Sequence, residues 1–345
     1  MLAGATPDGP APVERLSEDE EIVAGRRPVE EAFAARREAR RLLVVPERRS
    51  ALDQLVLHAT TLRIPVVEVE GGTITAISGF DGHQGVALVV APRRWATLDD
   101  VLALARTRGE PPLVLVLDHL EDPQNVGTLL RSAEACGVHG VLFPTQGAAP
   151  ISPAAIKASA GAVEHLLLVP MTDLPGGLVD LHARGVRIVG ADGDAALTVR
   201  EVDMRGPLAI VIGSEGRGLN ARVRRRVDIM ARIPMRGNVA SLNASVAGSV
   251  FLFEAAAQRW ASLPPPRNRA ADREADREAE EQPDLARSAN GGEAQSDSAP
   301  PAVVPGADAP AMPPDAGAVD AEATITGQPE RVDGLPIDDD DLLPA

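Results

Sequence analysis

The sequence is poor in the residues that build disulfides and membrane spans. Its 345 residues include one cysteine, Cys136, which excludes an internal disulfide and a cysteine-rich metal site. No apolar run approaches the roughly 18 residues of a membrane span, and the acidic N-terminus is unlike a signal peptide. We therefore expect a soluble cytoplasmic protein without membrane contact.

Lysine is also scarce, since 33 of the 34 basic residues are arginine. Arginine suits bidentate phosphate contact, although a GC-rich genome produces the same bias. The net charge of −16 is concentrated at the two ends, because residues 264–345 carry −13 and residues 1–21 carry −5. The stretch between them has 25 acidic and 27 basic residues, so the acidity does not exclude a nucleic-acid partner.

Both ends are rich in proline and acidic residues and have few large apolar groups. They cannot bury enough apolar surface to fold alone, which predicts disorder for residues 1–21 and 264–345. Between them we expect a small α/β domain over 22–92, a linker over 93–112 with a short helix at 98–105, and a second domain over 113–263.

The small domain is arginine-rich. Between Ile22 and Arg49 it has eight arginines, in four adjacent pairs, against four acidic residues. This basic surface suits RNA contact and equally suits a set of solvated faces, so both interpretations stay open. His83 lies in the loop before the last predicted strand, and we expect it to be structural. The predicted elements are a first helix that carries Val29, Ala32 and Phe33 on one face, strands at 42–45, 64–69 and 86–90, and a helix at 51–62.

The second domain alternates strands and helices. This alternation predicts a mainly parallel sheet covered by helices on both faces. The predicted strands are 113–118, 140–143, 166–169, 187–190, 208–213 and 229–233, and the predicted helices are 126–136, 153–159, 178–183, 221–226 and 244–260.

Polar residues follow the first of these strands. Pro123 ends the strand, Asn125 is a good N-cap for the next helix, and Arg131 lies nearly two turns into that helix. In α/β proteins, ligands bind outside the carboxyl ends of the buried parallel strands. Taken alone, the two residues fit equally well a capping asparagine with a solvated arginine.

Two further stretches stand out. Residues 213–220 hold three glycines in six residues, which lets the backbone approach a ligand closely. The spacing matches neither a phosphate loop nor the dinucleotide G-x-G-x-x-G pattern. Residues 233–243 lead into the last helix, whose small residues Ala244, Ala247 and Gly248 allow close packing. Ser241 and Asn243 lie at its start, where capping is the simplest role.

Together the three stretches resemble the three motifs of the SpoU/TrmH family of RNA ribose 2′-O-methyltransferases, within the SPOUT superfamily. The similar segments are 125–131, 212–219 and 233–243, with 159–162 in addition. Residues 24–32 and 83–85 are similar to the N-terminal domain of the large-subunit rRNA guanosine 2′-O-methyltransferase branch. The resemblance covers residues 22–260 and neither end.

The resemblance implies an architecture. The second domain would be a SPOUT-type α/β domain with a mainly parallel sheet and a C-terminal trefoil knot. A small α/β RNA-binding domain, like those of ribosomal proteins, would precede it. The family is typically homodimeric through the knotted domain, with the last helix in the interface and the active site near the subunit boundary.

It also implies the chemistry. A methyl group would pass from S-adenosylmethionine to a ribose 2′-hydroxyl of RNA, and no metal is required. The favoured substrate is rRNA, and tRNA is the alternative. The implied catalytic residues are Asn125, Arg131, Glu215, Ser241 and Asn243. Arginine is a poor base because its guanidinium holds its proton tightly, so we favour alkoxide stabilisation and positioning by Arg131 over proton removal. We therefore expect Arg131 to face inward, towards the ribose. The implied cofactor-binding residues are Gly190, Ala191, Ile212, Gly213, Gly216, Ile233, Met235 and Leu242.

Two other classes of function compete with this interpretation. A non-catalytic RNA-binding protein of ribosome assembly would share the small domain, but it would not need all five polar residues. An enzyme with another adenine-containing cofactor, such as a Rossmann dehydrogenase, would need a G-x-G-x-x-G pattern after its first strand, which is missing.

Overall fold

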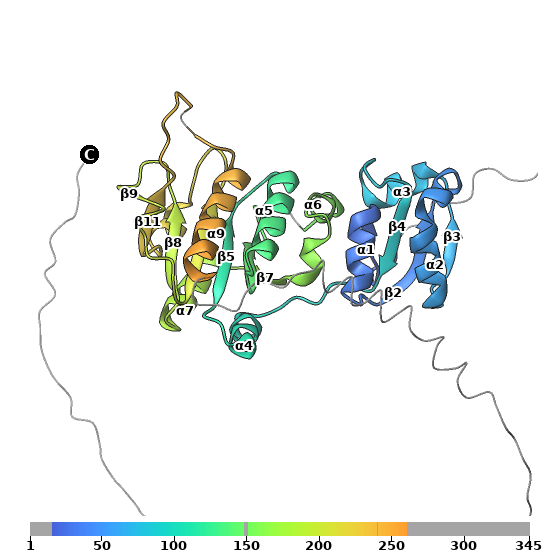
Figure 1. Cartoon of the computed structure of the whole chain (residues 1–345), viewed down its shortest axis with the longest axis horizontal. Coiled ribbons are helices and arrows are strands. Elements are labelled where there is room, and N and C mark those ends of the chain that lie inside the picture. The colour runs from blue at the N-terminus through green and yellow to red at the C-terminus, as the bar shows by residue number, and fades with distance from the viewer. Residues whose placement is uncertain (1–15, 148–150, 240, 261–345) are drawn as a thin grey trace, which may run out of the picture. The chain divides into compact units, whose positions relative to one another are not determined.

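The computed structural model describes residues 16–147, 151–239 and 241–260, which belong to one compact unit (Figure 1). The disorder predicted for 1–15 and for 264–345 lies outside the described residues. Residues 16–21 do have defined contacts. Within the described part, no helix is both long and apolar enough to cross a bilayer.

The small domain holds a four-stranded sheet in the order β1-β4-β2-β3. Strand β4 is antiparallel to both neighbours, and β2 is parallel to β3. Sequence patterns missed β1 and α3, which are short. The elements are β1 (Glu21–Ala24), α1 (Arg26–Ala34), β2 (Ala39–Val44), η1 (Pro46–Leu52), α2 (Asp53–Thr61), β3 (Val66–Glu68), α3 (Gly71–Ser78) and β4 (Val86–Val90).

Ion pairs neutralise much of the predicted basic surface. Asp19 pairs with Arg40 at 2.7 Å and Glu20 pairs with Arg41, so the segment predicted to be disordered is tied to β2. These contacts weaken the argument that the arginine pairs themselves bind RNA. Six of the eight arginines form ion pairs with described carboxylates: Arg26, Arg27, Arg37, Arg40, Arg41 and Arg49.

The second sheet has seven strands, all parallel, in the order β7-β6-β5-β10-β8-β11-β9. This confirms the mainly parallel sheet. Only the two-residue β9 was not predicted. The strands are β5 (Leu113–Asp118), β6 (Gly140–Pro144), β7 (Leu167–Met171), β8 (Arg187–Ala191), β9 (Leu197–Thr198), β10 (Leu208–Gly213) and β11 (Ile229–Arg232).

Helices cover both faces of this sheet, as predicted (Figure 1). Alternate residues of each strand serve the two faces: Leu115 and Ile210 pack with α5, α6 and α9, whereas Val114 and Val211 pack with α4, α7 and α8. Helix α4 is longer than predicted, and its buried Val101 packs against the sheet. The helices are α4 (Leu98–Arg108), α5 (Pro123–Ala135), α6 (Pro153–Ala158), α7 (Leu174–Ala183), α8 (Ala221–Arg224) and α9 (Ala244–Trp260).

The order of the strands places a topological switch point between β5 and β10. From β5 the chain moves to β6 and β7 on one side, and it later returns as β10 on the other side. Ligands of open α/β sheets bind outside the carboxyl ends of strands at such a switch point. The trefoil knot stays a prediction.

The segment 159–162, which resembles the family, lies against the small domain. Gly161 has φ +85°, and a Cβ there would lie 2.6 Å from Cβ of Glu31 on α1. The 3₁₀ helix η2 (Ala162–His165) carries Glu164, whose fully buried carboxylate accepts from Arg37 at 2.9 Å and from Arg93 at 2.7 Å. This segment therefore holds the two domains together.

Candidate active site

A cavity of about 420 Å³ lies outside the carboxyl ends of β8, β10 and β11 and against the first half of α9. Its volume falls in the range of roughly 300–1,000 Å³ that small-molecule sites occupy. Both the glycine-rich stretch and the stretch before α9 contribute to its lining. Segments that lie far apart in the sequence thus meet at one place.

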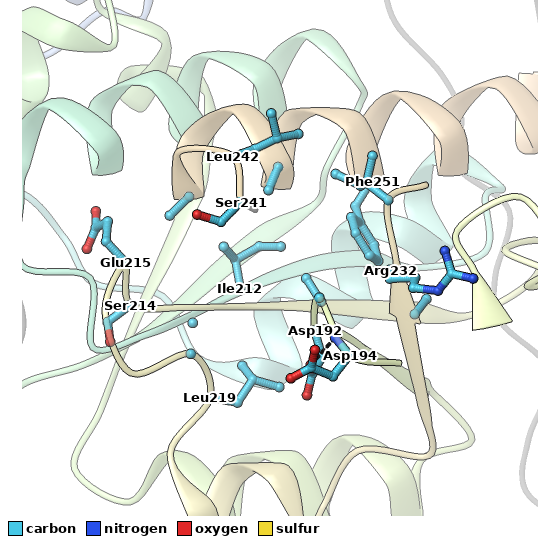
Figure 2. A pocket seen from close by; sticks show the side chains of 18 of the residues that line it. Asp192, Asp194, Ile212, Ser214, Glu215, Leu219, Arg232, Ser241, Leu242 and Phe251 are labelled. Carbon is cyan, nitrogen blue, oxygen red and sulfur yellow. Dashed lines mark hydrogen bonds between the residues drawn. The ribbon is translucent and has the colours of Figure 1, made fainter. Parts of the chain in front are cut away.

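The cavity has apolar walls and polar ends. Figure 2 shows Ile212 at its centre, with Ser214 and Glu215 on one side and Asp192 and Asp194 on the other. Further apolar contacts come from Leu219 and Phe251. Such a slot suits a ligand with a flat apolar ring and charged or polar groups at its ends.

The glycine-rich loop after β10 is folded back on itself. The backbone N–H of Ser214 donates to the carbonyl of Gly218 at 3.1 Å, and the Gly218 N–H returns a bond at 3.0 Å. A Cβ on Gly213 would lie 2.3 Å from the carbonyl carbon of Gly218. Only glycine therefore allows this loop to close over the end of β10.

A buried carboxylate joins this loop to β5. Asp118, the last residue of β5, is fully buried and accepts from the Asn220 N–H at 2.6 Å. Its other oxygen lies 2.6 Å from Nδ1 of His119. Asp118 thus fixes the loops that follow the two central strands relative to each other.

Asn125 links the first polar stretch to the second, because its side-chain amide donates to Oε1 of Glu215. The prediction that Asn125 caps the helix is wrong. Helix α5 begins at Pro123, and its N-cap is Asp122, whose carboxylate accepts from the Gln124 N–H at 2.9 Å. Proline suits the first helical position because its missing N–H is not needed there. Asn125 is consequently buried in the first turn and free to hold Glu215.

Arg131 does not point into the cavity of its own chain. Its side chain is exposed on α5 and is not part of the cavity lining, so the expectation of an inward-facing residue is corrected. The neighbouring residue, Ser132, contacts Ser249 of α9 at 2.8 Å between the two hydroxyl oxygens. Arg131 therefore lies next to the packing seam of α5 with α9.

Two polar residues of the stretch before α9 have different roles. Ser241 lines the cavity, whereas Asn243 caps the helix by accepting from the Ser245 N–H at 2.9 Å and the Ser245 hydroxyl at 2.6 Å. Close packing by a small residue is confirmed at Gly248, where a Cβ would lie 2.4 Å from Cδ2 of Leu129.

Six of the eight residues predicted to bind the cofactor line the cavity: Ala191, Ile212, Gly213, Ile233, Met235 and Leu242. Gly190 is buried one residue earlier in β8, and Gly216 lies in the loop outside the lining. Sequence reasoning missed Asp192 and Asp194, although they follow β8 at the same edge of the sheet and could have been found from that position.

Two titratable groups have informative surroundings. The Asp194 N–H, which donates to Asp192 at 2.9 Å, and the Arg224 guanidinium hold the pKa of Asp192 below its usual value, so it is ionised at neutral pH. Burial raises the pKa of Cys136 to about 12, which keeps its thiol protonated.

His83 is structural, as expected: it is buried, and its Nδ1 accepts from the Gly85 N–H at 3.1 Å.

Comparisons with known proteins agree with this geometry. Residues 112–253 match the model of the SpoU rRNA methylase family, and residues 22–96 match that of RNA 2′-O ribose methyltransferase substrate binding. An uncharacterized tRNA/rRNA methyltransferase of Mycolicibacterium vanbaalenii is 39% identical over 71% of this chain and 79% of its own length. The crystal structure of the SpoU methyltransferase AviRb from Streptomyces viridochromogenes, in complex with AdoMet, has a TM-score of 0.59 and 27% identity over 71% of this chain and 92% of that one.

A crystal structure of an RNA 2′-O ribose methyltransferase has a TM-score of 0.56 and 28% identity, over 70% of this chain and 89% of that one. These relatives span both domains of the described chain. They exclude the dehydrogenase alternative, whose fold would need a different nucleotide loop. The chain belongs to the SpoU family of RNA methyltransferases.

Proposed function

We propose that the protein transfers a methyl group from S-adenosylmethionine to a ribose 2′-hydroxyl of RNA. The observation that carries this proposal is the meeting of the three family stretches at the cavity and at the Asn125–Glu215 contact beside it. Support comes from the AviRb structure with AdoMet and from the substrate-binding model matched by the small domain.

The cavity fits this cofactor. When bound, S-adenosylmethionine supplies an electrophilic methyl group on a sulfonium. The apolar walls at Ile212, Leu219 and Phe251 suit the adenine ring, and backbone groups near Gly213 and Leu242 can hydrogen-bond its edges. The ionised Asp192 and the exposed loop residues offer polar partners for the remaining groups. Gly190 shapes the strand beneath, and Gly216 forms the loop tip.

The ribose hydroxyl must be aligned and must lose its proton. In our proposal Arg131 stabilises the forming alkoxide and binds the neighbouring phosphate. A guanidinium holds its proton too tightly to act readily as a base. The Asn125–Glu215 pair and Ser241 form the polar wall around the ribose, and Asn243 positions Ser241 by capping α9. Positioning supplies much of the rate enhancement, because the reaction between two bound reactants is effectively unimolecular.

We propose further that two copies pair through α9. Its outward face carries a stripe of exposed apolar side chains at helical spacing, Val246 (48% exposed), Val250 (37%), Phe253 (47%) and Trp260 (42%). A contiguous apolar helix face of this kind marks an interaction surface. Because Arg131 lies beside α9 and outside its own cavity, this pairing would bring the Arg131 of one copy to the site of the other.

The pairing makes a direct prediction for Phe253→Asp. Burying an unpaired carboxylate costs several kcal/mol, so we expect the dimer affinity to fall on the order of 100-fold or more. Sedimentation measures the mass at micromolar protein. The control is Leu57→Asp, which changes an exposed leucine of α2 (62%) and should leave the mass unchanged. A monomeric wild-type protein, or a Phe253→Asp variant as dimeric as the control, would contradict the pairing.

For the substrate we propose a guanosine of large-subunit rRNA in the cytoplasm, because residues 24–32 and 83–85 resemble that branch. Ribose methylation can be mapped in all RNA from cells that lack the gene. We expect one 2′-O-methylguanosine of large-subunit rRNA to disappear. Loss of a tRNA methylation instead would move the target to tRNA, the alternative, and no loss in any RNA would contradict methyl transfer.

A further inference from the structure

The basic residues of the second domain gather in one segment. Residues 113–260 contain 14 basic and 14 acidic side chains. Half of the basic ones are arginines within residues 217–236, where Asp228 is the one acidic residue. A stretch so unbalanced, in a domain whose charges balance only when the stretch is included, indicates a local positive potential.

Three of these arginines share one face of a short helical turn. The Arg225 N–H donates to the Ala221 carbonyl at 3.3 Å and the Arg226 N–H to the Val223 carbonyl at 2.8 Å, so the helical course of α8 continues to Arg226. Arg222, Arg225 and Arg226 are therefore neighbours at i, i+3 and i+4. All three are exposed, whereas Val223 is buried.

These three guanidinium groups form no ion pair with a carboxylate of the described residues. Arg224 differs, because its guanidinium is occupied by Asp192. Arg217 has Glu121 at 4.0 Å. Like charges held together on one turn repel one another, so leaving three of them uncompensated costs stability unless an anion binds there.

The turn is fixed at both ends and adjoins the cavity. Before it, the Asn220 N–H donates to the buried Asp118 at 2.6 Å. After it, Asp228 accepts from the Ile188 N–H at 2.8 Å. Leu219 and Arg224, on either side of Arg222, line the cavity. The three arginines are thus presented at a set position beside the site.

We propose that Arg222, Arg225 and Arg226 form a phosphate-binding surface, which holds the backbone of the substrate RNA next to the cavity. The proposal rests on the proposed function. The planar fork of arginine matches phosphate oxygens, and no aromatic side chain occurs in residues 217–236 to stack on a base. The surface therefore grips the RNA backbone irrespective of base sequence, while recognition of the nucleotide lies elsewhere.

The test combines Arg222→Gln, Arg225→Gln and Arg226→Gln and measures binding of transcribed large-subunit rRNA at several salt concentrations. Each lost phosphate contact should lower the slope of log K against log[salt] by about 0.7–0.9, so the triple variant should lose about 2–3. We expect the KM for RNA to rise roughly 10–100-fold near physiological salt while kcat changes less than about twofold. An unchanged affinity for S-adenosylmethionine shows that the variant is folded.

The control makes the same charge change at the opposite end of the strands, where their amino ends lie. Arg106, Arg184 and Arg205 are exposed and precede the amino ends of β5, β8 and β10. Their combined change to glutamine should leave the salt slope and the KM near the wild-type values. If the two triple variants behave alike, the surface is not a phosphate site. Each single variant at 222, 225 or 226 should lower the slope by about one third of the full effect. The salt dependence of RNA binding is measured without catalysis. If the wild-type protein transferred no methyl group, that result would therefore contradict the proposed function and not the phosphate-binding surface.

Discussion

Gly213→Ala is expected to weaken S-adenosylmethionine binding by at least about 100-fold. The added Cβ would lie 2.3 Å from the carbonyl carbon and 2.4 Å from the carbonyl oxygen of Gly218, and 2.6 Å from the Leu219 nitrogen. These are backbone atoms, so no side chain can swing away and the loop must open. An opened loop loses the backbone positions that pre-organise the cavity, which costs a few kcal/mol of binding free energy and hence about two orders of magnitude in affinity.

Gly216→Ala is the matched control. It lies in the same loop, three residues away, but a Cβ there meets no atom within 4 Å, and its φ is not in the left-handed region. Its affinity should stay within about twofold of the wild-type protein. Calorimetry measures both variants, and thermal melting shows that they are folded. A folded Gly213→Ala variant with wild-type affinity would place the cofactor outside this loop.

Arg131→Ala is expected to reduce kcat by roughly 10²–10³-fold while leaving the affinity for S-adenosylmethionine unchanged. The size is that of removing one preorganised charge from a developing oxyanion. The affinity is unaffected because Arg131 is not part of the cavity lining of its chain. Thr128→Ala is the control, since Thr128 is exposed on the same face of α5, one turn earlier. An active Arg131→Ala variant would remove this residue from the mechanism.

Mixing these two impaired variants, at an S-adenosylmethionine concentration too low to occupy the Gly213→Ala cavity, tests where Arg131 acts. In a hybrid of Arg131→Ala with Gly213→Ala subunits, an Arg131 that serves the partner's cavity would complete one site. Random pairing then restores about a quarter of the wild-type sites. An Arg131 that serves its own cavity leaves every hybrid site defective, so the mixture would stay inactive.

Most strands of the second sheet were predictable because each is a short, mainly apolar run between turn residues, whereas the two-residue β9 is too short to be recognised. β5 and β10 have the predicted bounds, since both faces of these central strands are buried. The helix starts were less predictable. Asn125 has the chemistry of a cap, but Asp122 followed by Pro123 competes for the same role one turn earlier and takes it.

The first strand was missed for a different reason. β1 has four residues and follows an acidic stretch, so composition favoured disorder. The acids are instead held by Arg40 and Arg41, which are distant in the sequence. Such long-range charge pairing cannot be read from local composition. The exposure of Arg131 was missed likewise, because a motif names the residue but does not show whether its side chain is exposed on α5.

Methyl transfer to RNA in vitro tests the central claim most directly. Purified protein is incubated with S-adenosylmethionine labelled in its methyl group and with transcribed large-subunit rRNA and tRNA, and the digested nucleosides are separated. We predict that the label appears in a nucleoside methylated at the ribose 2′-oxygen, and that Arg131→Ala lacks it. Label on a base, or RNA binding without any transfer, would contradict the account, and the second result would restore the non-catalytic RNA-binding alternative.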